Sequence, residues 1–362
     1  MWLTCSSIGR KFVMALTGIC LVLFVTFHCL MNAVALFWPT AYNAVCQFLG
    51  ANWYALVASI GLAALFIIHI IYALWLTVQN RKARGNDRYA VNSRPPQVEW
   101  SSKNMLVLGI VVLAFLGLHL VQFWAKMQLQ ELLDNELTAF PVVEGVPADP
   151  QYGTIFLQMA FAEWWTPVVY IIGFVALWFH LNHGFWSMFH TIGWDNNIWI
   201  ERLKKIGCWW TTIVVALFIA QAVVFTVRAN DKYYTTDEAL RNQYVEGLAE
   251  HVQPVVEEFL QAWQPVMQQT QMTGSPLPMQ HFMQQNGDYY MRHLEPAADA
   301  AEAMDVLESN QYLGTAYQIV AEIKRFREQA TPQQPAEATL PVVAPEAAQD
   351  ELSAEETETT NE

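Results

Sequence analysis

Five long apolar segments constrain the fold of this chain more than any other feature. The first four are 23 to 26 residues long, enough to cross a hydrocarbon core of about 30 Å with some tilt. Each is apolar around most of its circumference, which is typical of membrane helices rather than of amphipathic helices in soluble proteins. The sequence therefore predicts an all-α protein with a five-helix transmembrane bundle. The expected spans are 12–37, 54–78, 105–127, 167–189 and 206–227.

Lysine and arginine give these spans an orientation. Basic residues gather at Arg10 and Lys11 and in the loops 79–104 and 190–205, whereas the intervening loops are nearly devoid of them. Cytoplasmic loops of membrane proteins carry the excess of basic residues. We therefore predict a multi-pass protein of the inner (cytoplasmic) membrane, with a cytoplasmic N-terminus and with everything after Arg228 on the outer side.

Charge divides the chain at Arg228. Residues 1–228 have a formal net charge of +3 and residues 229–362 one of −17, within a total of −14. The first part is predicted to be the transmembrane domain, and 229–330 an acidic, helical, extracytoplasmic extension. The stretch 331–362 is rich in Pro, Ala, Thr and acids without any lysine or arginine, so it is expected to be a disordered acidic tail.

Helix signals organise the extension. Thr235 followed by Glu238 resembles a capping box that opens an amphipathic helix. Breaks are expected at 274–276 and at Glu295-Pro296, with further helices at about 277–294 and 297–329. The apolar stripe of the first helix consists of Leu240, Tyr244, Leu248, Val252 and Val255.

Each of the first four spans contains one deeply placed histidine. An ionisable side chain in lipid is costly and marks a functional site. His69 and His180 each lie nine residues before the cytoplasmic ends of their spans, and His28 and His119 lie nine and eight residues before the outer ends. At 1.5 Å per residue the two levels are roughly 10 Å apart. We therefore predict an inner pair, His69 with His180, and an outer pair, His28 with His119.

Paired imidazoles of this kind point to haem. Two facing histidines can bind both axial positions of a haem iron, which leaves no site for oxygen and makes the haem an electron carrier. The five cysteines include no C-x-x-C-H attachment sequence, so two non-covalent b haems are expected. A single membrane histidine more often bonds to a neighbouring helix, but four at matched depths favour a shared ligand. A disulfide between Cys29 and Cys46, both toward the outer side, is conceivable.

Four stretches within the first 228 residues resemble a known family. They are SSIGRK at 6–11, Phe27-His28 with Asn32, IHIIY at 68–72 and FHLNHGFW at 179–186. They are similar to the two-haem cytochrome b subunit of succinate:quinone oxidoreductases, which include the quinol:fumarate reductases of anaerobic bacteria, and are most like Bacteroides-type members. The resemblance ends at about residue 228 and says nothing of the extension.

The resemblance implies a membrane anchor that carries electrons between membrane quinone, with menaquinone as the expected species, and two partner subunits. A flavoprotein and an iron–sulfur protein would dock at the cytoplasmic face and carry out the dicarboxylate chemistry, as fumarate reductase or as succinate dehydrogenase. A homodimer of such heterotrimers is one assembly that fits. The family ligands match His28, His69, His119 and His180; the fourth lies four residues before the glycine, which selects His180 over His183.

Other candidate residues have weaker signals. Arg10, Lys11 and His183 are candidates for contacts with haem propionates at the inner face. The first outer loop, 38–52, contains no carboxylate, so quinone chemistry there would depend on Tyr42, Asn43 and Gln47, or on acids elsewhere such as Glu131 and Glu163. Ordinary interfacial anchoring is the favoured interpretation for each of these quinone candidates taken singly.

One position departs from the family pattern. Some relatives carry a glutamate two residues before the fourth ligand that is implicated in moving protons across the membrane. Trp178 stands there in this chain, so a proton path of that kind is not expected.

Two other functions fit the sequence. A cytochrome b of another respiratory complex, such as a hydrogenase or formate dehydrogenase, would show the same spectrum but other partner subunits. A haem-free transporter that moves protons through intramembrane histidines would show no Soret absorption. No phosphate-binding glycine loop, nucleophile elbow or nucleotide fingerprint occurs in the sequence, so the sequence predicts neither dicarboxylate catalysis nor nucleic-acid binding by this chain.

Overall fold

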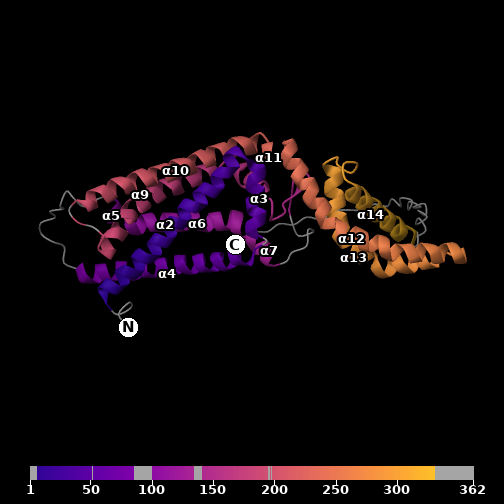
Figure 1. Ribbon diagram of the computed structural model, residues 1–362, viewed down its shortest axis with the longest axis horizontal. Helices are drawn as coiled ribbons and strands as arrows, with labels where there is room; N and C mark the ends of the chain where they lie inside the picture. Colours follow the sequence, from indigo (N-terminus) through magenta and orange to yellow (C-terminus); the bar gives the residue numbers. More distant parts are fainter. Residues whose placement is uncertain are drawn as a thin grey trace, which may run out of the picture.

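Helices make up nearly all of the computed structural model, which describes residues 6–50, 52–84, 100–133, 141–194, 196 and 198–330 (Figure 1). The sheet content of these residues is one short antiparallel hairpin, β1 Val142–Val143 with β2 Val146–Pro147. The predicted disordered tail, 331–362, lies outside the described residues. The all-α class predicted from the sequence is confirmed.

Five of the helices are long and apolar enough to cross a membrane, as the sequence predicted. Several continue past the apolar segments, because the flanking turns are polar but still hydrogen-bonded. Ser6, for example, caps the first helix by accepting a hydrogen bond from the Gly9 N–H at 2.9 Å. The five spans are α2 Ser7–Phe37, α4 Trp53–Arg84, α6 Met105–His119 with η1 Leu120–Trp124, α9 Thr166–Ile192 and α10 Trp199–Asn230.

The third span changes its winding at the predicted haem ligand. The α-helical part, α6, ends at His119, and the next turn, η1, is a π-helix in which the Ala125 N–H bonds to the Leu120 carbonyl at 2.8 Å. A π-turn is rare and inserts one extra residue per turn, which rotates the side chains that follow it. The apolar pattern of 105–127 contains no sign of this change. The chain then turns into the short helix α7 Gln128–Leu132.

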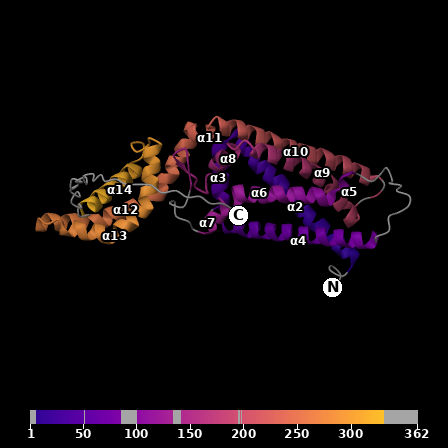
Figure 2. The same ribbon diagram turned by 180° about the vertical axis from the view of Figure 1, so that it is seen from behind.

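Short elements cover one end of the bundle, which we call the capped end. They are α3 Pro39–Gly50, α7, the β hairpin, α8 Gly153–Phe161 and α11 Tyr233–Thr236. Residues 38–52 were expected to be a loop, but α3 forms because Pro39 suits the first turn of a helix and because Tyr42 and Asn43 are buried against neighbouring elements. Eight of the nine residues of α8 are buried. The opposite, uncapped end holds the starts of α2 and α10 and the short helix α5 Trp100–Lys103 (Figure 2).

The extension forms three packed helices that project from the capped end (Figure 1). Leu240, Tyr244, Leu248 and Val252 of the predicted stripe are buried, and Val256 is buried rather than Val255. The N-cap is Asp237, whose side chain accepts from the Leu240 N–H at 3.1 Å, and not Thr235. The three helices are α12 Glu238–Thr273, α13 Leu277–Ala303 and α14 Gln311–Ala330.

The predicted helix break at Glu295-Pro296 is wrong. Helix α13 runs through Pro296 and ends at Ala303. Proline removes one hydrogen bond from a helix interior, but the small side chains Ala297, Ala298 and Ala301 behind it are fully buried and let α13 pack closely against its neighbours. The break at 274–276 is confirmed, since Gly274 ends α12 with a positive φ of 65°.

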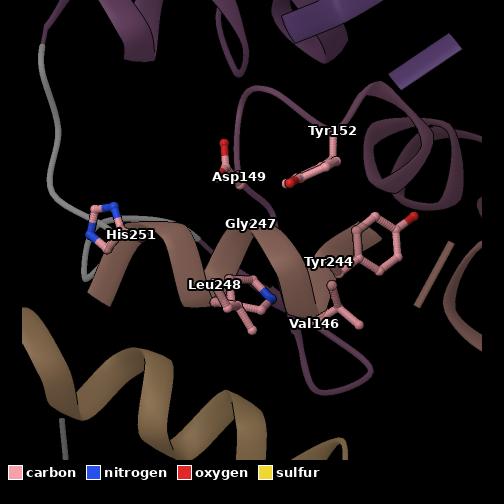
Figure 3. Close-up of a pocket in the computed structure, with 8 residues that line it drawn as sticks. Val146, Asp149, Tyr152, Tyr244, Gly247, Leu248 and His251 are labelled. Atoms are coloured by element: carbon pink, nitrogen blue, oxygen red, sulfur yellow. The ribbon is translucent and has the colours of Figure 1, made fainter. Parts of the chain in front are cut away.

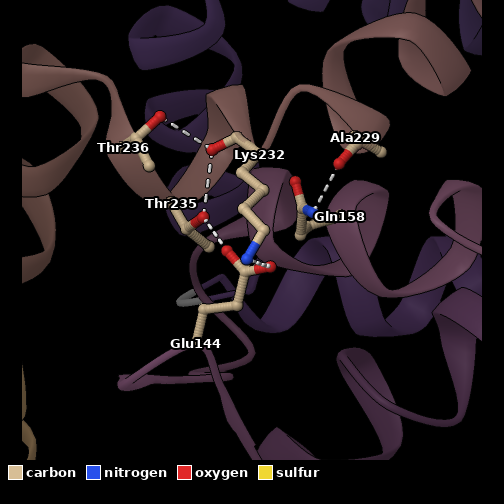
Figure 4. Close-up of polar contacts among 6 residues, drawn as sticks. All are labelled: Glu144, Gln158, Ala229, Lys232, Thr235 and Thr236. Carbon is tan, nitrogen blue, oxygen red and sulfur yellow. Dashed lines mark hydrogen bonds and ion pairs between the residues drawn. The ribbon is translucent and has the colours of Figure 1, made fainter.

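Polar contacts join the extension to the capped end (Figure 4). Glu144 of the hairpin turn pairs with Lys232 at 3.3 Å and accepts a hydrogen bond from the Thr235 hydroxyl. Gln158 of α8 donates to the carbonyl of Ala229 at 2.8 Å. These contacts fix the point at which the chain leaves the last membrane span.

Arg228, at the end of α10, ties that span to α2. Its guanidinium donates to the carbonyls of Ala35 and Leu36 at 2.7 and 2.8 Å. The last carbonyls of a helix have no partner within the helix. Arg228 therefore satisfies the end of α2 from a neighbouring helix.

Candidate functional site

The four span histidines come together as two pairs, in the combination that helix depth predicts. The rings of His28 on α2 and His119 on α6 have centroids 5.7 Å apart, with their planes at 88°. Those of His69 on α4 and His180 on α9 are 6.5 Å apart, at 59°. Imidazoles that bind one metal ion from opposite sides, with metal–nitrogen bonds of about 2 Å, have ring centres about 6 Å apart. Both pairs have the separation that axial ligation needs.

A hydrogen bond fixes the tautomer of His69. The Thr17 hydroxyl lies 3.0 Å from His69 Nδ1 and is also 3.0 Å from the carbonyls of Val13 and Met14. Because its single proton goes to a carbonyl, its oxygen accepts from Nδ1–H. The Nε2 lone pair of His69 is then unprotonated, which is the state a metal ligand requires.

A tyrosine hydroxyl assigns the tautomer of His119, in the other pair, by the same argument. The Tyr170 hydroxyl donates to Gln122 Oε1 at 2.8 Å and lies 3.3 Å from His119 Nδ1. Its oxygen therefore accepts from Nδ1–H and leaves Nε2 unprotonated. Gln122 lies in the π-turn η1. Sequence reasoning missed Thr17, Gln122 and Tyr170, although a glutamine three residues after a candidate ligand inside an apolar span was an available signal.

His180 has an unused donor or acceptor. Its Nδ1 is buried and has no hydrogen-bond partner among the described residues. Small residues face both members of this pair: a Cβ on Gly109 would lie 3.8 Å from His180 Cε1, and one on Gly18 would lie 4.0 Å from His69 Cε1. Glycine at these two positions leaves room beside the rings.

His28 differs from the other three. Its Nε2 lies 3.2 Å from the Asn32 amide nitrogen, which also donates to the His28 carbonyl at 2.8 Å. The Tyr42 hydroxyl donates to Asn32 Oδ1 at 3.3 Å. His28 Nε2 is thus hydrogen-bonded to Asn32 in this structure. Metal binding through that atom requires the His28 ring or the Asn32 amide to rotate.

Much of the apolar surface of α4 and α6, which carry His69 and His119, is left uncovered by the rest of the described chain. None of the apolar window of α4 is buried, and only 6 % of that of α6, against 39 % for α10. Aromatic rings lie against the outer pair: Phe24 stacks on His28 at 5.4 Å, and Phe115 and Phe123 lie 6.1 and 5.2 Å from His119. The donor set and the open, apolar surroundings fit a porphyrin, which supplies four ligands itself. In the part of the chain that is described, no three or more His, Cys, Asp or Glu gather to hold an ion.

The three residues expected to contact haem propionates have different surroundings. Arg10 places its guanidinium over the Trp75 ring, 5.2 Å from the centroid. Lys11 is exposed at the start of α2. His183 packs edge-on against Trp186, with centroids 5.0 Å apart. Trp178, at the departure from the family pattern, donates its indole N–H to Thr212 at 3.0 Å.

The three quinone candidates of α3 have different surroundings. Asn43 is fully buried; it accepts from the Thr154 N–H and hydroxyl at 3.0 and 2.8 Å and donates to Gln243 at 3.0 Å. Its polar atoms are therefore used to join α3, α8 and α12. Tyr42 contacts Asn32, as described above, and Gln47 hydrogen-bonds the Tyr152 side chain. Cys29 and Cys46 are both free thiols, so the structure has no disulfide between them.

Glu131 on α7 is the more notable of the two remaining acids. It lines a cavity of about 90 Å³ at the capped end, with its carboxylate against Gly50. Burial, helped by the charge of Asp149, raises the pKa of Glu131 to about 7. Glu163 is exposed in the turn before α9.

No family model, curated protein or solved structure matches the chain.

Proposed function

We propose that this chain is the di-haem cytochrome b membrane-anchor subunit of a quinol:fumarate reductase or succinate:quinone oxidoreductase. The observation that carries the proposal is the pairing of four intramembrane histidines at ring separations of 5.7 and 6.5 Å. Two haem b groups would be held non-covalently, one by His69 and His180 and one by His28 and His119. The sequence resemblance and the exposed apolar surface of α4 support the same assignment.

The chain's own residues would hold and tune these groups. Haem supplies one-electron transfer, with a potential set by its ligands and surroundings. Thr17 and Tyr170 keep the Nδ1 protons of His69 and His119 in place, which makes these ligands more basic and fixes their orientation. The apolar helices exclude water, and the phenylalanines beside the outer pair limit solvent access.

The uncapped end would face the cytoplasm and dock the iron–sulfur and flavoprotein subunits. The positive-inside rule supports this orientation, since Arg10, Lys11 and Lys204 lie at that end. The pair His69–His180 would then exchange electrons with the iron–sulfur subunit, and His28–His119 with membrane quinone near the capped end. The extension would lie outside the membrane.

Haem content tests this proposal directly. Pyridine haemochrome quantification of the purified complex should return two haems per polypeptide. His180→Ala should remove the inner haem, whereas His183→Ala, on the same helix, should retain it. A complex without Soret absorption would favour the proton-transporter alternative, and co-purification with hydrogenase or formate dehydrogenase subunits would favour another respiratory complex.

The electron path is tested separately. His119→Ala should abolish quinol-linked fumarate reduction, while artificial dyes still drive the partner subunits. Unimpaired quinol oxidation in this variant would place the quinone near the inner pair instead.

A further inference from the structure

The acidic extension is closely packed at its base, next to the capped end. Tyr152, in the segment before α8, packs edge-on against Tyr244 of α12, with ring centroids 5.3 Å apart (Figure 3). A Cβ at Gly247 would overlap the Tyr152 hydroxyl group, so the two elements approach as closely as a glycine allows. From its start to Phe259, α12 buries at least one apolar side chain in every turn.

The far end of the extension is uncovered. It consists of the end of α12, the turn and the start of α13, residues 260–286, which we call the hairpin tip. Met283 is the only buried residue among them, and the structure describes them all. Leu260, Met272 and Leu277 expose 44, 86 and 67 % of their surface. The tip thus presents large apolar side chains to its surroundings.

Helix α14 ends before it covers the hairpin tip. A Cβ at Gly287 would lie 3.4 Å from the Cγ2 methyl of Ile323, and Arg327 pairs with Asp288. The last turn of α14 therefore lies beside the part of α13 at which the tip begins, and α12 and α13 continue past it (Figures 1 and 2). The tip lacks the third helix that covers the rest of the extension.

The hairpin tip also lacks charged side chains. No Asp, Glu, Lys or Arg occurs between Glu258 and Asp288, although residues 229–362 have a net charge of −17. Surfaces that face water normally carry charged residues, whereas the centres of protein interfaces are depleted of them and enriched in methionine. The methionines of the tip are Met267, Met272, Met279 and Met283. This composition is typical of a surface that another apolar segment covers.

The chain contains a segment of the same character shortly after α14. Residues 338–345, ATLPVVAP, have no charge, whereas the whole stretch 331–362 has eight acids and no Lys or Arg. Chains expected to be disordered commonly bind through short motifs that become ordered on binding. Prolines favour an extended polyproline II conformation, which docks on aromatic side chains at low entropic cost. The apolar side chains of the segment are Leu340, Val342 and Val343.

We propose that residues 338–345 dock on the hairpin tip of the same chain. The ten residues from Ala330 to Leu340 span up to about 33 Å when extended. The tip is shorter, since the rise of an α-helix gives about 16 Å from Asp288 to Leu277. The segment therefore reaches every part of the tip, and its tether holds it there at an effective concentration of about 1 mM or more.

The hairpin tip offers this segment an aromatic surface. The rings of Trp263 and Phe282 are half-buried and lie 5.3 Å apart, one on each helix of the hairpin. Leucine and valine side chains that pack on these rings leave water at both surfaces, which is the main driving force of such contacts. The acids that flank the segment, Glu337 and Glu346, remain in solvent.

Other occupants fit the hairpin tip less well. A second copy of the chain would bring two acidic extensions together, which repulsion between like charges disfavours. Lipid around the spans does not reach the tip, because the tip lies at the end of the described chain away from them (Figure 1). The docking is independent of the proposed function, since no residue of the bundle takes part in it.

Disulfide cross-linking of the full-length chain tests the docking. All five native cysteines precede residue 209, so the extension has no competing thiol. Val342→Cys combined with Leu277→Cys should form a disulfide within one chain on mild oxidation. The control, Leu352→Cys with Leu277→Cys, places the thiol in the charged part of the tail and should give about tenfold less product. Equal yields from both pairs would overturn the proposal, and a disulfide between two chains would assign the tip to a second copy instead.

Hydrogen exchange followed by mass spectrometry tests the docking without added cysteines. The double variant Val342→Asp with Val343→Asp should exchange the amides of the hairpin tip about tenfold faster than wild type, because charged side chains do not pack on the aromatic surface. Leu352→Asp should exchange them at the wild-type rate. Exchange that the double variant leaves unchanged, or that Leu352→Asp accelerates equally, would overturn the docking.

Discussion

Replacing Asn43 by alanine should destabilise the junction of the bundle and the extension without affecting quinone binding. Its side chain accepts two hydrogen bonds from Thr154 and donates one to Gln243, two hundred residues further along the chain. Thr154 lies in the first turn of α8, whose N-cap residue, Tyr152, provides no side-chain cap. Asn43 therefore accepts a hydrogen bond from a free N–H in the first turn of α8, a bond that a capping side chain of the same helix normally provides.

The expected loss follows from which partners remain. In Asn43→Ala the Thr154 hydroxyl still contacts the Tyr244 hydroxyl at 2.8 Å, and Gln243, half-buried, can reach water. The Thr154 N–H, however, is fully buried and loses its acceptor, which costs about 1–3 kcal/mol. With about 1 kcal/mol for the other two hydrogen bonds, the total is about 2–4 kcal/mol.

Thermal unfolding in detergent measures this loss. We expect Tm to fall by about 5–10 °C, and limited proteolysis to release the extension sooner. Asn43→Asp keeps the acceptor and should lose less, and Asn242→Ala, exposed on α12, should behave as wild type. A stability change under about 0.5 kcal/mol together with a raised KM for quinol would refute the structural role. That result would instead support a role of Asn43 in quinone binding.

Three further changes have defined outcomes. Tyr170→Phe removes the acceptor of the His119 Nδ1–H, so redox titration should show the potential of that haem raised by about 20–60 mV; an unchanged potential would argue against the assigned tautomer. Because burial raises the pKa of Glu131 from 4.5 to about 7 in the folded chain, the unfolded chain releases this proton first, so stability that is fully present below about pH 4.5 is lost as pH rises to about 7. Tm should therefore fall between about pH 4.5 and pH 7 and level off above pH 7, and Glu131→Gln should show no such fall. Arg228→Gln should cost about 1–3 kcal/mol in thermal unfolding, with Arg228→Lys recovering only part, because lysine lacks the forked guanidinium.

Local properties of the chain were readable from the sequence. Hydropathy identified the five spans, and a fixed rise per residue sorted His28, His69, His119 and His180 into the two pairs whose rings are neighbours in the structure. The stripe that begins at Leu240 likewise gave the first helix of the extension. Each inference needed only residue spacing along one helix, which tertiary packing does not alter.

Other features depend on contacts between distant segments. The proline at 296 remains inside α13 because close packing of alanines compensates for it, and Asn43 serves α8 and α12 because α3 lies between them. The π-turn after His119 and the position of the Glu131 carboxylate against Gly50 have no local signature. Hydropathy and periodicity are properties of single segments, whereas hydrogen-bond partners and pKa values depend on which segments the fold brings together, and only the tertiary structure decides that.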